Sequence, residues 1–219
     1  MGVDAFYTIQ DGVDAVADSG TIHVYDGTYL ESVYIIEKDM TITGVSMDPT
    51  GVIVDAEDDE EVFNIFGVDN LTIEYLTAQY GDDDIIDITD SGIITLDHLI
   101  VQYADEDGID AHYTDQVIVS NTTIQYMGDD GISFYEVGTA TIEEVTIEYG
   151  FGSGINYEEG DLLDVDGLWI SDFDSNGIET DYVEEIDVND ATIQYTGDSS
   201  MELYYGYSIT LDTVNVSYT

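Results

Sequence analysis

The sequence predicts an all-β protein, a parallel β-helix (solenoid) of about nine coils with a short N-terminal capping helix. Three observations predict this class: a 23-residue repeat, alternating apolar and polar residues within each repeat, and a glycine- and acid-rich turn at a constant place in the repeat. Alternation with a period of two is typical of strands. One such repeat cannot bury its own apolar face, whereas stacked copies share a continuous core.

The repeat is clearest in a column of tyrosines. Its members, each 23 residues after the last, are Tyr80, Tyr103, Tyr126, Tyr149, Asp172, Tyr195 and Tyr218. A parallel apolar column contains Ile73, Leu96, Val119, Ile142, Val165, Val188 and Leu211, and a glycine column contains Gly108, Gly131, Gly154 and Gly177. We interpret the tyrosines as inward-facing or corner residues whose rings stack along the axis and hold the coils in register. A stripe for glycan stacking is the alternative.

The two ends of the chain are predicted to differ. In residues 8–19 the apolar residues Ile9, Val13 and Val16 have helical spacing, and Gly20 ends the pattern. We expect this helix to cover the open edge of the first coil. An irregular coil at residues 47–69 precedes the regular coils of residues 71–219, and no capping helix follows them. We expect one domain over residues 1–219 with an uncapped C-terminal coil.

The charge of the chain is extreme. Its 219 residues contain 50 Asp and Glu, one lysine (Lys38) and no arginine, so the formal net charge is −49. This composition repels nucleic acid and anionic membranes, and no apolar run is long enough for membrane insertion. Cysteine is absent, so no disulfide framework is predicted.

The chain resembles the right-handed parallel β-helix superfamily with the pectate-lyase-like fold, and most of all the NosD-like surface and periplasmic repeat proteins. The resemblance lies in the opening YTIQDGVDAVADSGTIHVYDGTYLESVYI and in the repeated ITL, TI and GI segments. It implies the fold and leaves the function open, because this fold carries lyases, hydrolases, epimerases, adhesins and scaffolds. The catalytic members are known for arginine and other basic residues, and this chain offers no position for those motifs.

The acidic turns are the candidate metal site. Three successive turns read GDDDII, ADEDGI and MGDDGI, and no basic residue accompanies them. Stacked carboxylates without partners repel one another, and calcium binds six to eight oxygens in flexible geometry. The predicted Ca2+ ligands in these turns are Asp82, Asp83, Asp84, Asp105, Glu106, Asp107, Asp129 and Asp130. The alternative is a set of solvated turns, where Asp and Gly are ordinary residues.

The stretch DFDSNG at residues 172–177 resembles the first half of a calcium loop and adds Asp172, Asp174 and Asn176 to the predicted ligands. Its glycine is also explained by the coil repeat, and Val183 stands where a bidentate glutamate would be expected. A second acidic column, which includes Glu74, Asp97 and Glu143, is predicted to face solvent.

The leading functional interpretation is a non-catalytic extracellular or cell-surface module, structural or adhesive, that binds Ca2+ on its acidic turns. Expected partners are a second copy stacked end to end, further repeats of a longer chain, or cell-surface glycans. A carbohydrate-active protein of the lyase or epimerase kind is the alternative. A further alternative is a salt-adapted scaffold without a specific metal, in which the charge of −49 serves solubility.

Overall fold

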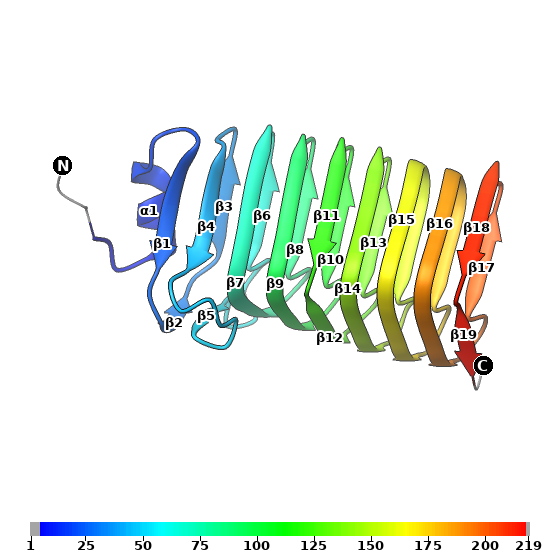
Figure 1. Cartoon of the computed structure of the whole chain (residues 1–219). Helices are drawn as coiled ribbons and strands as arrows, with labels where there is room; N and C mark the ends of the chain where they lie inside the picture. The colour runs from blue at the N-terminus through cyan, green and yellow to red at the C-terminus, as the bar shows by residue number, and fades with distance from the viewer. Residues whose placement is uncertain (1–4, 218–219) are drawn as a thin grey trace.

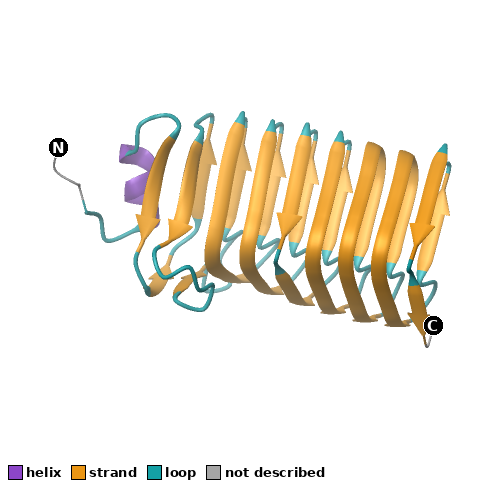
Figure 2. Ribbon diagram, viewed as in Figure 1, coloured by secondary structure: helices purple, strands orange, loops and turns teal. Residues whose placement is uncertain are grey.

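Successive coils of the chain stack along one axis into a rod with three faces (Figure 1 and Figure 2). The structure is a computed structural model and describes residues 5–217. The strands are β1 (Gly20–Val24), β2 (Gly27–Leu30), β3 (Val33–Ile36), β4 (Met40–Gly44), β5 (Val52–Asp55), β6 (Phe63–Phe66), β7 (Asn70–Gly81), β8 (Ile86–Thr89), β9 (Ile93–Ala104), β10 (Ile109–His112), β11 (Gln116–Ser120), β12 (Thr123–Met127), β13 (Ile132–Tyr135), β14 (Thr139–Gly150), β15 (Ile155–Phe173), β16 (Ile178–Thr196), β17 (Met201–Tyr204), β18 (Ser208–Asp212) and β19 (Asn215–Ser217). Some strands lie on one face, whereas the long strands β7, β9, β14, β15 and β16 bend round a corner and continue on the next face. We call the faces that begin with β1, β2 and β3 face 1, face 2 and face 3.

Neighbouring coils pair in parallel and in register with the sequence repeat. Ile73 of β7 lies opposite Leu96 of β9, which lies opposite Val119 of β11, so each partner is 23 residues further along. The predicted fold class, a parallel β-helix of about nine coils with a 23-residue repeat, is confirmed. Tyr218, the last member of the tyrosine column, lies outside the described residues.

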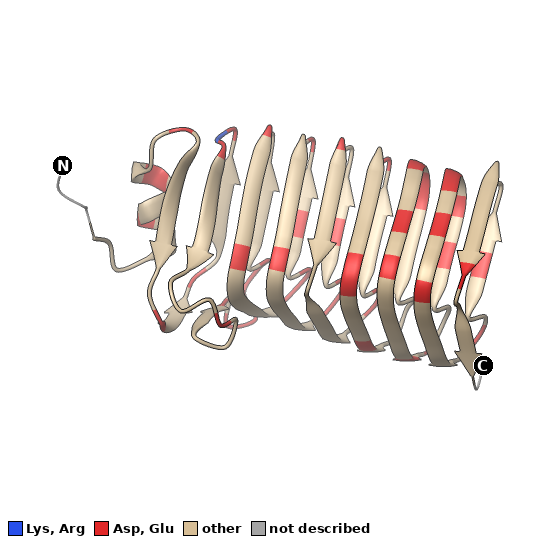
Figure 3. Ribbon diagram, in the orientation of Figure 1, with Lys and Arg blue, Asp and Glu red and all other residues tan. Residues whose placement is uncertain are grey.

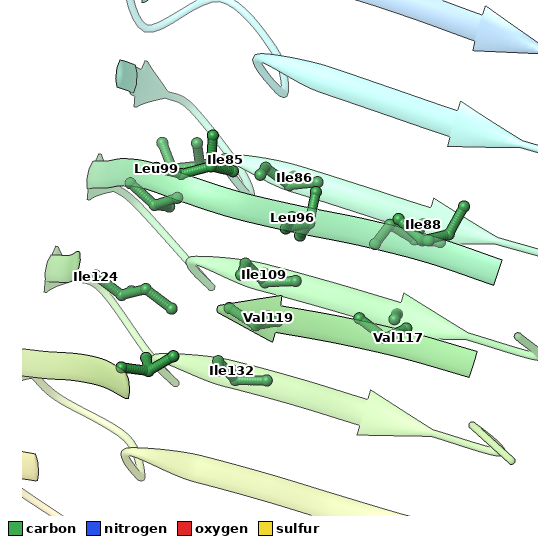
Figure 4. Close-up of a cluster of buried hydrophobic side chains, with 14 of the residues drawn as sticks. Ile85, Ile86, Ile88, Leu96, Leu99, Ile109, Val117, Val119, Ile124 and Ile132 are labelled. Carbon is green, nitrogen blue, oxygen red and sulfur yellow. The ribbon is translucent and has the colours of Figure 1, made fainter. Parts of the chain in front are cut away.

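Side chains from all three faces meet in one continuous core. Ile86, Ile109 and Ile132 on face 3 are each 0 % exposed and lie in a row along the axis (Figure 4). Leu96 and Val119 of face 1 are also fully buried. The inward column therefore repeats at the coil spacing, about 4.8 Å for neighbouring strands, and each side chain packs on its counterpart in the next coil.

The corners of the coil are made by single residues with a left-handed backbone. Tyr103 (φ 63°) ends face 2, and Tyr182 (φ 57°) joins face 3 to face 1. This conformation usually favours glycine or asparagine, because a Cβ atom crowds the backbone there. Here tyrosines adopt it at repeated places, so the predicted tyrosine column sits at a corner and its side chains are partly exposed.

The helix α1 (Ile9–Ala15) covers the N-terminal end of the rod (Figure 2). Thr8 caps it by accepting the Asp11 N–H at 3.1 Å, and Ile9 and Val13 are buried against the first coil. The helix ends earlier than the predicted residue 19 because Val16 takes an extended backbone. The Lys38 ammonium donates to the Val13 carbonyl at 2.6 Å and so satisfies a helix C-terminal acceptor.

Candidate functional site

The predicted acidic turns lie side by side along one edge of the rod, between face 2 and face 3. Acidic residues also run along the faces themselves, whereas the one basic residue lies near the N-terminal end (Figure 3). Within each turn the first two positions face solvent and the third turns inward. Asp82, Asp83, Asp105, Glu106 and Asp129 are exposed, Asp84 and Asp107 are partly buried, and Asp130 is buried.

The third turn position forms a ladder of hydrogen bonds between coils. Asp84 Oδ1 accepts the N–H of Asp107 at 2.9 Å, and Asp107 Oδ1 accepts the N–H of Asp130 at 2.7 Å. The ladder continues from Asp130 to the N–H of Ser153. Each carboxylate thus satisfies a backbone donor of the following coil, beside turn N–H groups such as that of Glu106, which pairs with the Asp83 carbonyl. We call Asp84, Asp107 and Asp130 the carboxylate ladder.

Burial shifts the ladder carboxyls strongly toward the protonated form. It raises the pKa of Asp84 to about 8, that of Asp107 to about 7 and that of Asp130 to about 6. The backbone N–H bonds oppose the shift, and neighbouring carboxylates add to it. On face 3, burial also raises the pKa of Asp110, although its carboxylate lies 2.7 Å from the His112 Nε2 atom.

Three of the predicted ligands come together. Asp83, Asp84 and Glu106 each offer a carboxylate oxygen, and these oxygens all lie within 4.8 Å of one another. The charge of Asp83 raises the pKa of Glu106. We call these residues the carboxylate triad. Such a group can share protons or hold a hard cation, because like charges at this distance repel unless one of them is neutralised.

The stretch DFDSNG joins the same ladder and stays apart from the triad. Asn176 is buried, and its Oδ1 accepts the N–H of Ser199 at 2.9 Å, just as the ladder carboxylates do. The Gly177 backbone is not left-handed; a Cβ there would lie 2.3 Å from Ile193 Cγ2 and 2.5 Å from the Ser200 carbonyl oxygen. The glycine is required by the close approach of the next coil, and no metal loop is needed to explain it.

Asp172, Asp174 and Asp105 border a shallow cleft together with aromatic side chains. The cleft has a volume of about 590 Å³, and Tyr126, Tyr149 and Phe151 supply its aromatic walls. Tyr80, Tyr103, Tyr126 and Tyr149 form a continuous stack, in which successive ring centroids are 4.9, 5.0 and 5.1 Å apart and the rings are nearly parallel. The stack ends at Tyr149 because Asp172 takes the next corner position.

From the sequence, a glycan-stacking stripe was only the alternative interpretation of the tyrosine column, and Asp172 and Asp174 were predicted metal ligands; their meeting with the tyrosines in this aromatic cleft was not predicted. The signal that could have found it is the single break in the tyrosine column at Asp172, beside Phe151 in a turn that otherwise carries Asp or Gly. The second acidic column lies on face 1, where Ser120 Oγ donates to Asp97 at 2.7 Å. These outward residues are spread along the face, and they do not line the aromatic cleft.

The chain belongs to the right-handed β-helix family: the family described as "Right handed beta helix region" matches residues 61–217. Among solved structures, the pectin methylesterase from Aspergillus niger aligns with a TM-score of 0.65 and 13% identity over 95% of this chain and 84% of that one. Escherichia coli YbhC aligns with a TM-score of 0.50 and 10% identity, over 92% and 81%. At these identities the likeness concerns the fold. No curated protein sequence matches the chain significantly.

The prediction that the chain is not an enzyme is wrong as an inference from this fold and composition. A pectin methylesterase, an enzyme, shares the fold over nearly the whole chain. The prediction treated missing arginine as evidence against catalysis, but arginine is needed only by mechanisms that use its charge, and carboxyl groups transfer protons without it.

In residues 5–217 no helix is long and apolar enough to cross a membrane.

Proposed function

We propose that the protein is a carbohydrate-active β-helix protein that binds a neutral or esterified polysaccharide along the turn edge and transfers protons to it through the carboxylate triad. The observation that carries the proposal is the succession of two features along one edge: the tyrosine stack ends in an open cleft that begins at Asp105, and carboxyls with raised pKa values lie in the turn of Asp105 and in the turn before it. The turn edge runs along the whole rod (Figure 1), and this length fits a polymeric substrate such as an extracellular polysaccharide.

The cleft suits a sugar polymer by its chemistry. Tyr149 ends the stack and is 44% exposed, so the face of its ring that Tyr126 does not cover offers apolar surface for the C–H face of a sugar. Asp105, Asp172 and Asp174 border the same hollow and can accept hydrogen bonds from hydroxyl groups. Binding sites commonly combine an apolar wall with a few polar groups that orient the ligand. Because consecutive coils repeat this edge, several sugar units could lie along it.

The carboxylate triad supplies an acid and a base. With a pKa raised to about 8, Asp84 is mostly protonated at pH 7 and can donate a proton to a leaving oxygen. Asp83 and Glu106, within 4.8 Å of it, can serve as base or nucleophile. Carboxyl pairs whose environments separate their pKa values divide the acid and base roles in this way. The field of a chain with net charge −49 disfavours free uronates, so the substrate is uncharged or methyl-esterified.

The proposal is tested with methyl-esterified polygalacturonate, free polygalacturonate and neutral glucans and xylans at moderate salt. Reducing ends report hydrolysis, methanol reports ester cleavage, and ultraviolet absorbance reports unsaturated elimination products. We expect one of the three reactions to be detected with an uncharged polymer. Its rate should fall above about pH 8 as Asp84 ionises. Asp84→Asn should lower kcat by ~100-fold or more, the usual range for a general acid. Tyr149→Ala should raise KM with little change in kcat.

The matched control is Glu143→Gln, which removes a carboxylate on face 1 away from the turns and should leave all readouts unchanged. If the unmodified protein is no more active than the Asp84→Asn variant on every polymer of the panel, the catalytic proposal is wrong. If the polymer also fails to bind to the unmodified protein in affinity electrophoresis, the carbohydrate proposal fails as a whole.

A second candidate role for the triad is Ca2+ binding, and the meeting of three carboxylate oxygens within 4.8 Å favours it. Calcium would need the ionised form of Asp84 and therefore competes with its proton. We expect 10 mM Ca2+ to raise Tm more at pH 9 than at pH 6, and more than Mg2+ or NaCl at matched ionic strength. Glu106→Gln should reduce this shift while Glu143→Gln should not. Equal shifts with all salts would indicate charge screening and no specific site.

A further inference from the structure

A second hollow lies on a different corner of the rod, where face 3 turns into face 1 near the C-terminal end. It has a volume of about 720 Å³ and is bordered by three carboxylates and three tyrosines. The carboxylates are Glu159, Asp161 and Glu184, and the tyrosines are Tyr182, Tyr205 and Tyr207. None of these residues belongs to the turn edge of the proposed carbohydrate site.

Two of the tyrosines that line the hollow stack on each other. The Tyr182 and Tyr205 rings are stacked, with centroids 4.6 Å apart and an interplanar angle of 5°, and the residues are 55% and 67% exposed. Glu159 occupies the same corner position one coil before Tyr182, as the register of Glu158 with Asp181 and of Gly160 with Val183 requires. The uncovered side of the Tyr182 ring therefore faces the position of a carboxylate, about one coil spacing away.

The carboxylates of this hollow have no cationic partner in the described part of the chain. Among residues 5–217 the one lysine, Lys38, donates its ammonium to the carbonyls of Val13 and Asp14 at the other end of the rod. A simple metal cation would satisfy the charge but would leave the ring faces without a contact. An alkylammonium group satisfies both, because its charge meets the carboxylates while its methyl or methylene groups lie on the electron-rich ring faces.

We propose that this hollow, which we call the ammonium cleft, binds a ligand bearing an alkylammonium group. The group lies against the face of Tyr182, with Glu159 and Glu184 as counter-charges and Tyr207 closing the outer side. The site is independent of the carbohydrate site because its residues come from the opposite corner of face 3. Quaternary and primary ammonium ligands share this chemistry, and the experiment separates them.

The test is a calorimetric titration of the whole chain in 0.5 M NaCl, where nonspecific counter-ion binding is screened. Three probes are compared: choline, n-butylammonium and the neutral isostere of choline, 3,3-dimethyl-1-butanol. We expect saturable binding of one or both cations and at least ~10-fold weaker binding of the neutral probe. Stronger binding of choline assigns a quaternary ligand, and stronger binding of n-butylammonium assigns a primary amine such as a lysine side chain.

Variants separate the cleft from the general charge of the protein. Tyr182→Leu should weaken binding of the preferred cation about tenfold, whereas Tyr182→Phe, which keeps the ring face, should bind like the unmodified protein. Tyr126→Leu, in the other cleft, is the control and should not change binding. Glu159→Gln gives a second route if Tyr182→Leu fails to fold. Equal affinity for cation and isostere, or affinity unchanged in both Tyr182→Leu and Glu159→Gln, would overturn the proposal.

Discussion

Replacing Asp84, Asp107 and Asp130 together by asparagine is expected to stabilise the folded protein at pH 8 and to remove most of the pH dependence that these groups cause. Asparagine keeps the acceptor that each ladder position needs, because its Oδ1 can receive the N–H of the next coil. Asn176 already does this in the same column, accepting the Ser199 N–H at 2.9 Å and donating to Glu179 at 2.8 Å. The variant removes the cost of ionising a buried carboxyl and preserves the hydrogen bond.

The sign of the pH effect follows from the raised pKa values. The folded protein holds protons on Asp84, Asp107 and Asp130 up to about pH 8, 7 and 6, whereas an unfolded aspartate loses its proton near its model value of 3.8. The stability from these groups is therefore fully present below about pH 4 and is lost as pH rises toward 8. One pKa unit corresponds to about 1.4 kcal/mol. Because the groups are partly solvated and coupled, we expect on the order of 3 kcal/mol for the three together, well below the simple sum.

The measurement is the free energy of unfolding in urea at pH 5, 7 and 9, in 1 M NaCl to screen the outward carboxylates. The unmodified protein should become less stable from pH 5 to pH 9, and the triple asparagine variant should be nearly level. The control replaces Glu143 by glutamine and Asp166 and Asp212 by asparagine on face 1; it should retain the pH dependence. A triple ladder variant that is less stable than the parent at pH 9 would show that the ionised carboxylates are useful to the native state, as a bound cation would make them.

Gly131→Ala is expected to destabilise the protein by ~3 kcal/mol, because the coils approach too closely there to admit a methyl group. An added Cβ would lie 2.3 Å from Ile147 Cγ2 and 2.6 Å from the Gly154 carbonyl oxygen. That carbonyl accepts the Ile132 N–H at 3.1 Å, so it cannot move without breaking the pairing of two coils. Overpacking in a dense core usually costs about 1–3 kcal/mol. For a chain of this size, the loss should lower Tm by roughly 6–12 °C.

The matched control is Gly27→Ala in β2, where the nearest atom to an added Cβ is 3.7 Å away and the backbone is not left-handed. It should leave Tm unchanged or raise it slightly, since alanine reduces the freedom of the unfolded chain. Thermal unfolding of both variants by circular dichroism compares them directly. A Gly131→Ala protein as stable as the parent would mean that the coil spacing relaxes, and the glycine column would then need another explanation.

The asparagine variants also separate the two roles proposed for the carboxylate triad. If the triad transfers protons, Asp84→Asn should lose activity. If it binds Ca2+, the same change should lower the calcium-induced rise in Tm. The gain in stability at pH 8 in chelator is expected under either role, because it comes from the burial of Asp84, so the activity and the calcium shift are the two assays that distinguish the roles.

The sequence by itself determined the solenoid, its period and its core. The 23-residue spacing of residues such as Ile73, Leu96 and Val119 predicts which side chains stack, because alternation along a strand is a local property and the repeat sets the partner in the next coil. It also located the acidic turns. Only the tertiary structure decided what those turns do. Asp84 and Asp107 have the same residue type and neighbours as solvated turn residues, yet they accept hydrogen bonds from the next coil and are partly buried.

The conformation of the corner residues could not be predicted from the sequence for a related reason. Glycine or asparagine in a sequence usually indicates a left-handed backbone, but here Tyr126 and Tyr149 adopt it. Their rings point outward and form part of the stack and its cleft. The direction of a corner side chain depends on how the coil closes, and closure is set by the packing of all three faces on the core. Burial, and with it the pKa of each carboxyl, arises only once the coils are stacked, so no local pattern could predict it.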